Sequence, residues 1–409
     1  MNFFRYNKSY LFVENLLVDK LARKLETPFY CYSLSQIHYN ISKFQKSFKR
    51  VKPLICFSVK SNSNITILKE FKKRECGADV VSIGELISAL KAGINPKKIV
   101  FSGIGKTEKE LEFAIKKNIL LINVESESEA NLINKISKKL SKTTSIGIRY
   151  NPNIDAKTHR KISTGRKIDK FGFTEKNLLE FYKKSKKLKN ISLDCLSVHI
   201  GSQITKINPF KKLKKSINKI IKKIRYKFKF VDLGGGIGIP YSLNDKKIDL
   251  NAYSKLVEKF KKNHNCKIIF EPGRSMVGNA AILISKVIYV KKGLNKDFII
   301  MDAGMNDLIR PALYGVNHQI LPAKKNNYKS KRKLEFVGPI CESSDKFLET
   351  KKFQKINEND FLVISDVGAY GMSLSSNYNL RPKLLELLVS KNKSKIIRRR
   401  QTLSELIRR

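Results

Sequence analysis

Between residues 53 and 271, eight apolar, strand-like runs alternate with amphipathic segments that have the residue spacing of helices. Eight strand–helix units in series are typical of a (β/α)8 barrel, in which all strands are parallel. A doubly wound open sheet is the competing interpretation, but it usually has fewer strands and a glycine-rich fingerprint after the first strand, which is missing here. The eight runs are PLICFSV, ADVVS, KIVFS, ILLINV, SIGIRY, LDCLSVHI, KFVDL and KIIFE.

The pattern changes after residue 280, where β-rich runs such as DFIIMDAG, LEFVGPI and DFLVISDVGAY follow one another without helical segments between them. The segment TPFYCYS, before residue 35, is also strand-like. We therefore predict an α/β chain in which residues 35–280 form the barrel. Residues 281–409 are expected to form a β-sandwich or β-barrel domain that also includes the N-terminal strand, from residues 1–34.

The charge of the chain is strongly positive, with 83 Lys and Arg against 35 Asp and Glu and a formal net charge of +48. The lysines are spread over the whole length and alternate with apolar residues at helical spacing, as in KKLKKSINKIIKKIRYKFKF. This pattern is typical of solvated helix faces, and the chain has no RRM, KH or zinc-finger signature. Nucleic acid is therefore not expected as a partner.

The apolar runs are too short to cross a membrane, and the first 20 residues lack the continuous apolar core of a secretory signal. The six cysteines include no C-x-x-C pair, and four lie in or beside apolar runs. This usage predicts reduced thiols in a cytoplasmic protein without a structural zinc site or any other metal.

In a parallel barrel the functional face lies at the carboxyl ends of the strands. The polar residues at the ends of the predicted strands should therefore share one rim. A lysine, a histidine, a glycine-rich loop and an acid–arginine pair are among them. These candidates are Lys60, Asp79, Ser82, Glu85, Arg149, His199, Gly201, Ser202, Gln203, Gly234, Gly235, Gly236, Gly238, Glu271, Gly273 and Arg274.

Taken together, these residue types predict a site for pyridoxal 5'-phosphate. The DLGGGIGIPY segment offers backbone N–H groups that a phosphate can approach closely, because no Cβ intervenes. The acid Glu271 could keep a pyridine nitrogen protonated, and Lys60 could bind the aldehyde. Singly, each signal is weak, since a glycine-rich turn is often only a turn and a strand-end histidine is more often structural.

Nine ordered motifs run nearly from end to end of the chain: FSVKSNSN, GADVVSIGEL, RYNPNIDAKTHRKISTG with KFG, SVHIGSQI, VDLGGGIGIPY, EPGRSMV, DAGMNDLIRPALYGVNH, GPICESSDKF and GAYGMSLSSNYNLRP. In this set the chain resembles the fold-type III pyridoxal-phosphate decarboxylases, and within them the branch that acts on diaminopimelate. The resemblance implies that Lys60 is the Schiff-base lysine, that His199 stacks on the cofactor ring and that Glu271 pairs with the pyridine nitrogen. The implied phosphate ligands are Ser202, Gly234, Gly235, Gly236, the backbone around Gly273 and Arg274, and Tyr370, which would also contact the substrate.

The same resemblance gives the β domain the substrate residues and implies a homodimer whose two active sites are shared across the interface. Cys341, on a segment that enters the neighbouring subunit, would be the acid that protonates the carbanion. Glu342 would bind the distal amine, and Arg310, together with Arg274, would hold the distal carboxylate. Tyr314 is a further implied substrate contact.

The implied reaction is decarboxylation of meso-2,6-diaminopimelate to L-lysine and CO2, the last step of lysine biosynthesis. The unreacting end of this substrate carries an ammonium and a carboxylate, so its site needs an acid and an arginine together. Ornithine carries only a distal ammonium there, and related enzymes of that type have Cys-Asp where this chain has Cys-Glu. A related decarboxylase acting on ornithine, arginine or carboxynorspermidine is the alternative, with an alanine-racemase-like enzyme and a non-catalytic cofactor carrier behind it.

Some residues also allow simpler interpretations. Cys341 could be a small buried apolar residue, and Arg310, before Pro311, could be a surface charge. Ser344 stands where the family usually has glycine, and a serine held at positive φ would cost about 1 kcal/mol. Ser61 replaces the family's usual alanine, and His318 receives no predicted role.

Overall fold

The structure is a computed structural model that describes residues 3–156, 159–162, 164–242 and 245–407. The chain divides into a barrel unit, Ile41–Pro240 with Lys246–Ser275, and a β unit, Met1–Asn40 with Tyr241–Asp245 and Met276–Arg409. The boundaries predicted after residues 34 and 280 fall within six residues of these divisions and stay predictions of domain organisation. Lys157, Thr158 and Ser163, from the RYNPNIDAKTHRKISTG motif, lie outside the described residues.

The barrel unit confirms the predicted (β/α)8 fold. Its eight strands are hydrogen-bonded in parallel to their neighbours and close in the order β10-β11-β12-β5-β6-β7-β8-β9, so the doubly wound alternative is wrong. The strands are β5 (Leu54–Ser58), β6 (Gly77–Val80), β7 (Ile99–Phe101), β8 (Leu121–Val124), β9 (Thr144–Arg149), β10 (Ile191–Ser197), β11 (Phe230–Asp232) and β12 (Lys267–Phe270).

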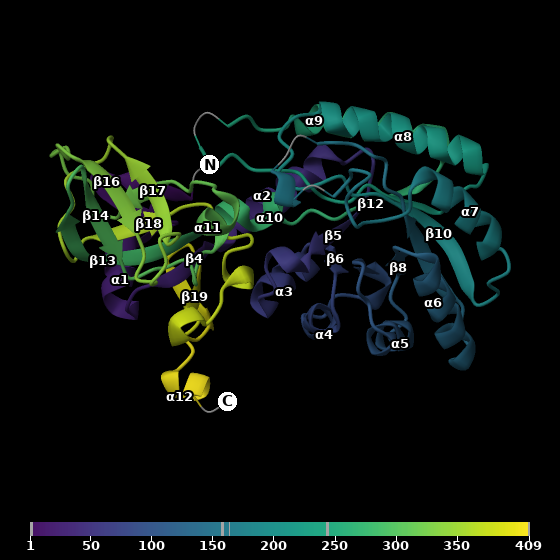
Figure 1. Ribbon diagram of the computed structural model, residues 1–409, viewed down its shortest axis with the longest axis horizontal. Helices are drawn as coiled ribbons and strands as arrows, with labels where there is room; N and C mark the ends of the chain where they lie inside the picture. The colour runs from purple at the N-terminus through teal and green to yellow at the C-terminus, as the bar shows by residue number, and fades with distance from the viewer. Residues whose placement is uncertain (1–2, 157–158, 163, 243–244, 408–409) are drawn as a thin grey trace. The chain divides into compact units, whose positions relative to one another are not determined.

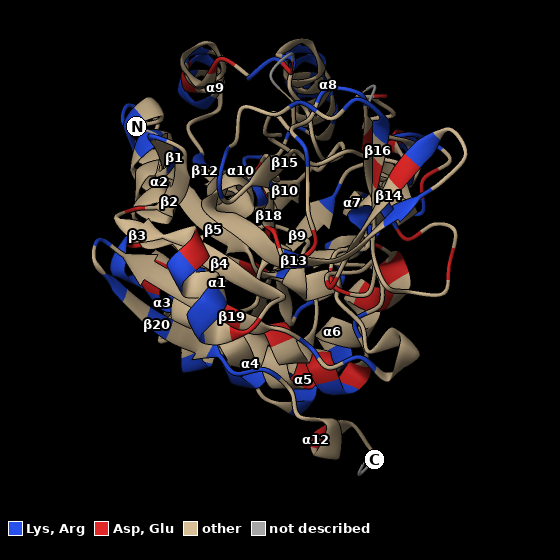
Figure 2. Cartoon of the chain, turned by 90° about the vertical axis from the view of Figure 1, so that its left-hand side faces the viewer, with Lys and Arg blue, Asp and Glu red and all other residues tan. Residues whose placement is uncertain are grey.

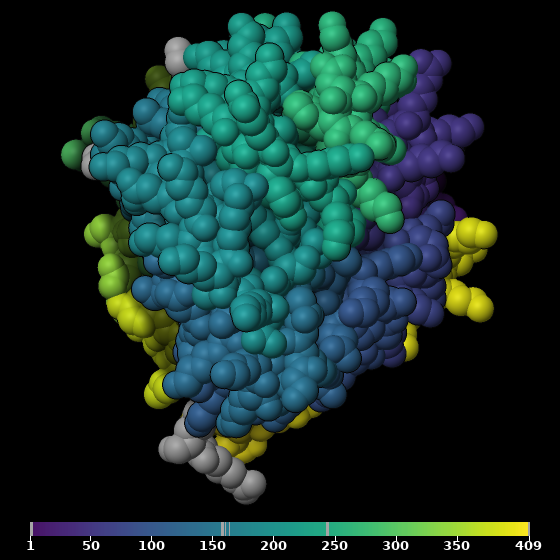
Figure 3. Space-filling view, turned by 90° about the vertical axis from the view of Figure 1, so that its right-hand side faces the viewer, coloured from purple at the N-terminus to yellow at the C-terminus, as the bar shows by residue number. Residues whose placement is uncertain are grey.

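Amphipathic helices follow the strands and form the outer surface of the barrel unit (Figures 1 and 3). Polar side chains cap the first turns of most of them; Thr107, for example, forms a reciprocal capping box with Glu110 at the start of α5. The helices that follow barrel strands are α3 (Ile65–Lys73), α4 (Ile83–Lys91), α5 (Glu108–Lys116), α6 (Glu127–Lys139), α7 (Glu175–Ser185), α8 (Asn208–Ile224) and α9 (Leu250–His264). Helix α2 (Leu34–Ser47) precedes the first barrel strand, and its residues up to Asn40 belong to the β unit.

Helix α8 shows where the many lysines of this chain lie. Its apolar residues recur every three or four positions and are buried, while most of its lysines are exposed. Lys and Arg are spread over helices and strands of both units (Figure 2). Among the described residues, no helix has the length and apolarity needed to cross a membrane. The buried α8 residues are Phe210, Leu213, Ile217, Ile220 and Ile224.

In the β unit, segments from both ends of the chain share one mixed sheet, as predicted. The N-terminal strand β4 pairs antiparallel with β13 on one side and parallel with β19 on the other. The main path of the sheet is β17-β16-β14-β13-β4-β19-β20, and β18 joins β13 to β15. Its strands are β4 (Phe29–Ser33), β13 (Ala281–Lys292), β14 (Lys296–Met301), β15 (Ile320–Pro322), β16 (Lys333–Val337), β17 (Lys346–Thr350), β18 (Phe361–Ile364), β19 (Leu385–Ser390) and β20 (Lys393–Arg398).

A smaller sheet of three N-terminal strands, β1 (Phe4–Asn7), β2 (Tyr10–Val13) and β3 (Leu16–Leu17), also belongs to the β unit. Its residues Leu11 and Val13, together with Val18 and Leu21 of α1 (Val18–Leu25), pack into the same apolar core as β4 and β13. Residues 11–21 are therefore part of the core of the β unit.

Candidate active site

The inside of the barrel changes from apolar to polar toward the carboxyl ends of its strands. An apolar cluster contains residues from five strands, with Phe230 of β11 packed against it. Because side chains on one face of a strand repeat every second residue, the polar residue two positions later lies one layer nearer the rim. The apolar–polar pairs are Cys56 and Ser58, Val100 and Ser102, Leu121 and Asn123, Cys195 and Ser197, Phe230 and Asp232, and Ile269 and Glu271.

Lys60 lies at this rim, in a 3₁₀ turn (Val59–Ser61) directly after β5. Its amine nitrogen Nζ is 3.0 Å from Oδ2 of Asp79, which is fully buried at the end of β6. The hydroxyl of Ser58 donates a hydrogen bond to the same oxygen over 2.6 Å. The side chain of Lys60 is 37% exposed, so its amine is held by a buried carboxylate while remaining accessible.

His199 follows β10 and has a defined protonation state. Its Nδ1 accepts a hydrogen bond of 3.1 Å from the Gly235 amide, so the ring proton of the neutral form is on Nε2. Burial lowers the pKa of His199 well below its ordinary value, and the positive charges of Arg149 and Lys60 lower it further. The imidazole is therefore neutral, and this suits a ring that stacks on a heterocycle.

The glycine-rich loop after β11 orients the side chains of the rim. The Gly234 amide donates to Oδ1 of Asp232 over 2.9 Å, and the Gly235 amide donates to His199. A Cβ on Gly235 would lie 2.1 Å from the carbonyl oxygen of Glu271, so this position has no room for a side chain. The Gly234 and Gly235 amides are thus engaged, whereas within the described part of the chain no hydrogen bond is seen from the Gly236 amide.

Ser202 and Arg274, both predicted phosphate ligands, lie together. Nη2 of Arg274 donates to the hydroxyl of Ser202 over 3.2 Å, and Arg274 is 5% exposed at the start of the short helix α10 (Arg274–Val277). Gly273 precedes it, and a Cβ there would lie 3.0 Å from the side chains of Ser58 and Ser61. The EPGR segment is thus packed closely against the turn that carries Lys60.

Three buried acids, Asp79, Asp232 and Glu271, lie in the polar layer of the barrel. The Ser102 hydroxyl donates to Oε1 of Glu271 over 3.2 Å, and the Asn123 amide donates to both Ser102 and Asp232. Burial raises the pKa of Glu271 well above its ordinary value, and the nearby charges of Asp232 and Asp79 add to this effect. The three acids therefore cannot all be ionised with Lys60 as the only cation beside them, and Glu271 keeps its proton to a higher pH than an ordinary carboxyl does.

Asp232, Asn123 and Ser102 are not among the site residues predicted from the sequence. The signal that could have found them is the two-residue repeat along each strand, which places a polar residue directly above an apolar one. Their contacts cross from strand to strand and join residues far apart in the sequence: Asn123 and Asp232 are 109 positions apart, and Ser102 and Glu271 are 169 positions apart.

In the β unit, Arg310 begins α11 (Arg310–Tyr314) and is only 3% exposed, so its interpretation as a surface charge is wrong. Its Nη1 lies 2.7 Å from Nε2 of His318. Tyr314 ends the same short helix and is half-buried. Tyr370 is also half-buried and has a φ of 58°, a left-handed conformation that it shares with several other residues of the chain.

The loop with Cys341 and Glu342 is exposed, so the interpretation of Cys341 as a buried apolar residue is wrong. The hydroxyl of Tyr378 donates to Oε1 of Glu342 over 2.6 Å, and the backbone amide of Cys341 contacts Oδ1 of Asn379 at 3.5 Å. Ser344 does not have a positive φ, so the expected strain at this departure from the family pattern is absent.

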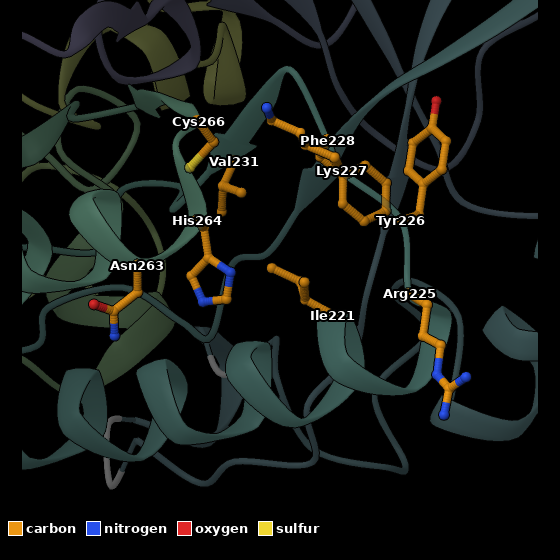
Figure 4. A pocket seen from close by; sticks show the side chains of 9 residues that line it. All are labelled: Ile221, Arg225, Tyr226, Lys227, Phe228, Val231, Asn263, His264 and Cys266. Atoms are coloured by element: carbon orange, nitrogen blue, oxygen red, sulfur yellow. The ribbon is translucent and has the colours of Figure 1, made fainter.

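A pocket of about 280 Å³ lies at the opposite end of the barrel strands (Figure 4). It is bounded by the last turns of α8 and α9 and by the starts of β11 and β12, where barrels are usually built for stability. No predicted site residue lines it. The lining residues are Ile221, Arg225, Tyr226, Lys227, Phe228, Val231, Asn263, His264 and Cys266.

Comparisons with known proteins agree with one another. The family model for the pyridoxal-binding domain of pyridoxal-dependent decarboxylases matches residues 34–278. Diaminopimelate decarboxylase of Helicobacter pylori is 43% identical over 393 residues, which are 95% of this chain and 97% of the relative. The corresponding enzyme of Aquifex aeolicus is 39% identical over 408 residues, 99% of this chain and 96% of the relative.

A crystal structure of the H. pylori enzyme complexed with L-lysine has the same fold as this chain. The TM-score is 0.91 at 43% identity, and the match covers 95% of this chain and 98% of the other.

Proposed function

Because the chain belongs to the diaminopimelate decarboxylase family of pyridoxal-dependent decarboxylases, we propose that it converts meso-2,6-diaminopimelate to L-lysine and CO2. The observation that carries this proposal is the rim of the barrel, where an accessible lysine, a neutral histidine and a buried acid cluster lie together. The H. pylori relative was crystallised with L-lysine, the product of this reaction, which gives further support.

We propose pyridoxal 5'-phosphate as the cofactor, since the residues at the rim fit it. A protonated ring nitrogen beside Glu271 would supply the positive charge that lets this buried carboxyl ionise. When bound, the cofactor withdraws electrons from the substrate Cα, so that a carboxylate can leave. The phosphate would be bound by Ser202, the Gly236 amide, the backbone at Gly273 and Arg274, and Tyr370, while Gly234 and Gly235 hold the side chains around it.

The side chains of the chain then have distinct tasks. Lys60 would hold the cofactor through its amine, and Asp79 would keep that amine in place whenever it is released. His199 would offer a neutral ring face, oriented by the Gly235 amide. Cys341 would donate a proton to Cα after CO2 leaves, which is a role for an accessible thiol.

The substrate residues explain the choice of diaminopimelate. Its unreacting end carries both charges, so Arg310 and Arg274 would bind the carboxylate there and Glu342 the ammonium. We also propose a homodimer in which the loop with Cys341 and Glu342 serves the active site of the partner. The exposure of this loop supports that assembly, and a cytoplasmic location stays a prediction from the sequence.

The test uses the purified protein with added pyridoxal 5'-phosphate. We expect an absorption band near about 420 nm that is lost in Lys60→Ala and kept in Lys69→Ala, a control on the exposed face of α3. We also expect L-lysine and CO2 from meso-diaminopimelate, and no CO2 from ornithine, arginine or carboxynorspermidine. If the protein is yellow but releases CO2 from ornithine, arginine or carboxynorspermidine instead, the proposed substrate is wrong and the proposed cofactor is still supported.

A further inference from the structure

Arg310 is enclosed in the β unit by the ring side chains of His318 and Tyr241, neither of which has a role predicted from the sequence. Nη1 of Arg310 lies 2.7 Å from Nε2 of His318, and its guanidinium carbon lies 4.4 Å from the ring centre of Tyr241. The rings of His318 and Tyr241 meet nearly edge to face, with centres 5.1 Å apart. Arg310 is 3% exposed and His318 1% exposed, so the arrangement is shielded from water.

The hydrogen bonds fix the state of the His318 ring. Nδ1 lies 2.8 Å from the backbone carbonyl oxygen of Ser365, which can only accept, so Nδ1 carries a proton. Arginine can only donate, so Nε2, which faces Arg310, must be the unprotonated acceptor. His318 is therefore neutral, with a single tautomer held between a carbonyl and a permanent cation.

Tyr241 makes the burial of the Arg310 charge favourable. A guanidinium over a tyrosine face is attracted by the ring electrons, and this attraction grows when water is excluded. Tyr241 directly follows the DLGGGIGIP run after β11, yet Tyr241–Asp245 belongs to the β unit. The segment that supplies the glycine-rich loop thus also supplies one of the two contacts that hold Arg310.

We propose that His318 and Tyr241 are positioning residues that fix the Arg310 guanidinium for recognition of the substrate's distal carboxylate. This inference rests on the proposed function, because that function gives Arg310 its task. A purely structural role would make both residues matter for folding alone. A positioning role makes them matter for ligands that carry the carboxylate and not for ligands that lack it.

The experiment compares two ligands of the cofactor-loaded enzyme. L-Lysine retains the distal carboxylate of the substrate, and cadaverine is the same molecule without it. Three variants are measured: His318→Leu, which removes both hydrogen bonds; His318→Gln, which keeps an acceptor near Nε2; and His264→Leu, a control at the end of α9 that contacts Asn218.

We expect His318→Leu to weaken L-lysine binding by about tenfold, the scale of a lost hydrogen bond to a charged group, and to leave cadaverine binding unchanged. His318→Gln should bind L-lysine to within about threefold of the parent enzyme. The KM for meso-diaminopimelate should rise in the variants in the same order as the Kd for L-lysine, while kcat stays at the parent value. Equal weakening of both ligands, or unchanged L-lysine binding, would overturn the proposal.

Two controls separate this outcome from other failures. If the parent enzyme forms no L-lysine from meso-diaminopimelate, the proposed function is wrong. That result is obtained without any variant, so it is distinct from a failure of the positioning role of His318. If His318→Leu does not fold, as judged by circular dichroism, Tyr241→Leu and Tyr241→Phe replace it. The phenylalanine variant keeps the ring over Arg310 and should keep L-lysine binding, while the leucine variant should lose it; equal binding by both would contradict the role of Tyr241.

Discussion

Lys60 Nζ lies 3.0 Å from Asp79 Oδ2 at the rim of the barrel, and the same oxygen accepts a hydrogen bond from the Ser58 hydroxyl. Asp79 is fully buried, while the Lys60 side chain is one-third exposed. In the proposed site the carboxylate would be the fixed point to which the amine returns when it is released from the cofactor. Without it, the four-carbon stem of Lys60 would sample many rotamers, and the amine would spend less time in the reactive position.

We expect Asp79→Asn to lower kcat for meso-diaminopimelate by about tenfold to hundredfold, because a displacement of a reacting group by about 1 Å has effects of this size. The absorption band of the bound cofactor should remain, and the rate at which the cofactor-free protein takes up pyridoxal 5'-phosphate should fall. Asp249→Asn is the control, since asparagine caps α9 as well as aspartate does. Unchanged kcat and uptake rate in Asp79→Asn would show that the ion pair has no part in either step.

The second prediction concerns the pH dependence of stability in the cofactor-free protein. Burial raises the pKa of Glu271 above its value in the unfolded chain, and Asp232 and Asp79 add to the shift. The folded state then holds this proton more tightly, so the contribution of Glu271 is favourable below the unfolded pKa. It is lost as the pH rises from the unfolded pKa toward the folded one.

Glu271→Gln cannot become charged, so it should stabilise the cofactor-free protein near about pH 7.5 and have little effect near about pH 4. The gain should exceed the about 0.5 kcal/mol that is typical of neutral surface substitutions. Urea unfolding at both pH values measures it, with Glu108→Gln on the exposed face of α5 as the control. In the loaded enzyme the same variant should lose about hundredfold in kcat, because the partner of the ring nitrogen is gone. A variant less stable than the parent at neutral pH would refute this account of the acid cluster.

The fold could be predicted from the alternation of strand-like and helix-like runs in the sequence. The residues at the rim could be predicted because parallel strands place their carboxyl ends together. Lys60, His199 and Glu271 could be assigned to one rim from their positions after apolar runs. Asp232 could have been added by the two-residue repeat of a strand. The contacts of Arg310 could not be predicted in this way. His318 lies in a loop after a short helix, Tyr241 lies about 70 positions earlier in the sequence, after β11, and no periodic pattern connects the two residues with Arg310.

The third prediction compares two glycines that differ only in their surroundings. A Cβ at Gly235 would lie 2.1 Å from the Glu271 carbonyl oxygen, and the Gly235 amide orients His199. A Cβ at Gly105 would meet no atom within 4 Å. Gly235→Ala must therefore move the backbone of the rim, and Gly105→Ala need not.

We expect Gly235→Ala to destabilise the protein by about 1–3 kcal/mol, the range for overpacked sites, and to abolish stable binding of pyridoxal 5'-phosphate. Gly105→Ala should change neither property by a measurable amount. Urea unfolding and the cofactor absorption band give the two readouts. If both variants retain the cofactor equally, the loop after β11 is only a turn, and its place in the proposed site is wrong.

The last prediction tests how Glu342 is held. The Tyr378 hydroxyl donates to Oε1 of Glu342 over 2.6 Å, and both residues are exposed in the single chain. The hydrogen bond limits the directions that the carboxylate can take without neutralising it, so a substrate ammonium can still bind. Tyr378→Phe removes only the hydroxyl and should raise the KM for meso-diaminopimelate by about threefold to tenfold, with kcat within about twofold of the parent. Tyr328→Phe, on another exposed tyrosine of the β unit, should leave both constants unchanged. A fall in kcat at constant KM would instead mean that Tyr378 acts on the reacting end of the substrate, because a contact to the distal ammonium is made equally before and during the chemical step.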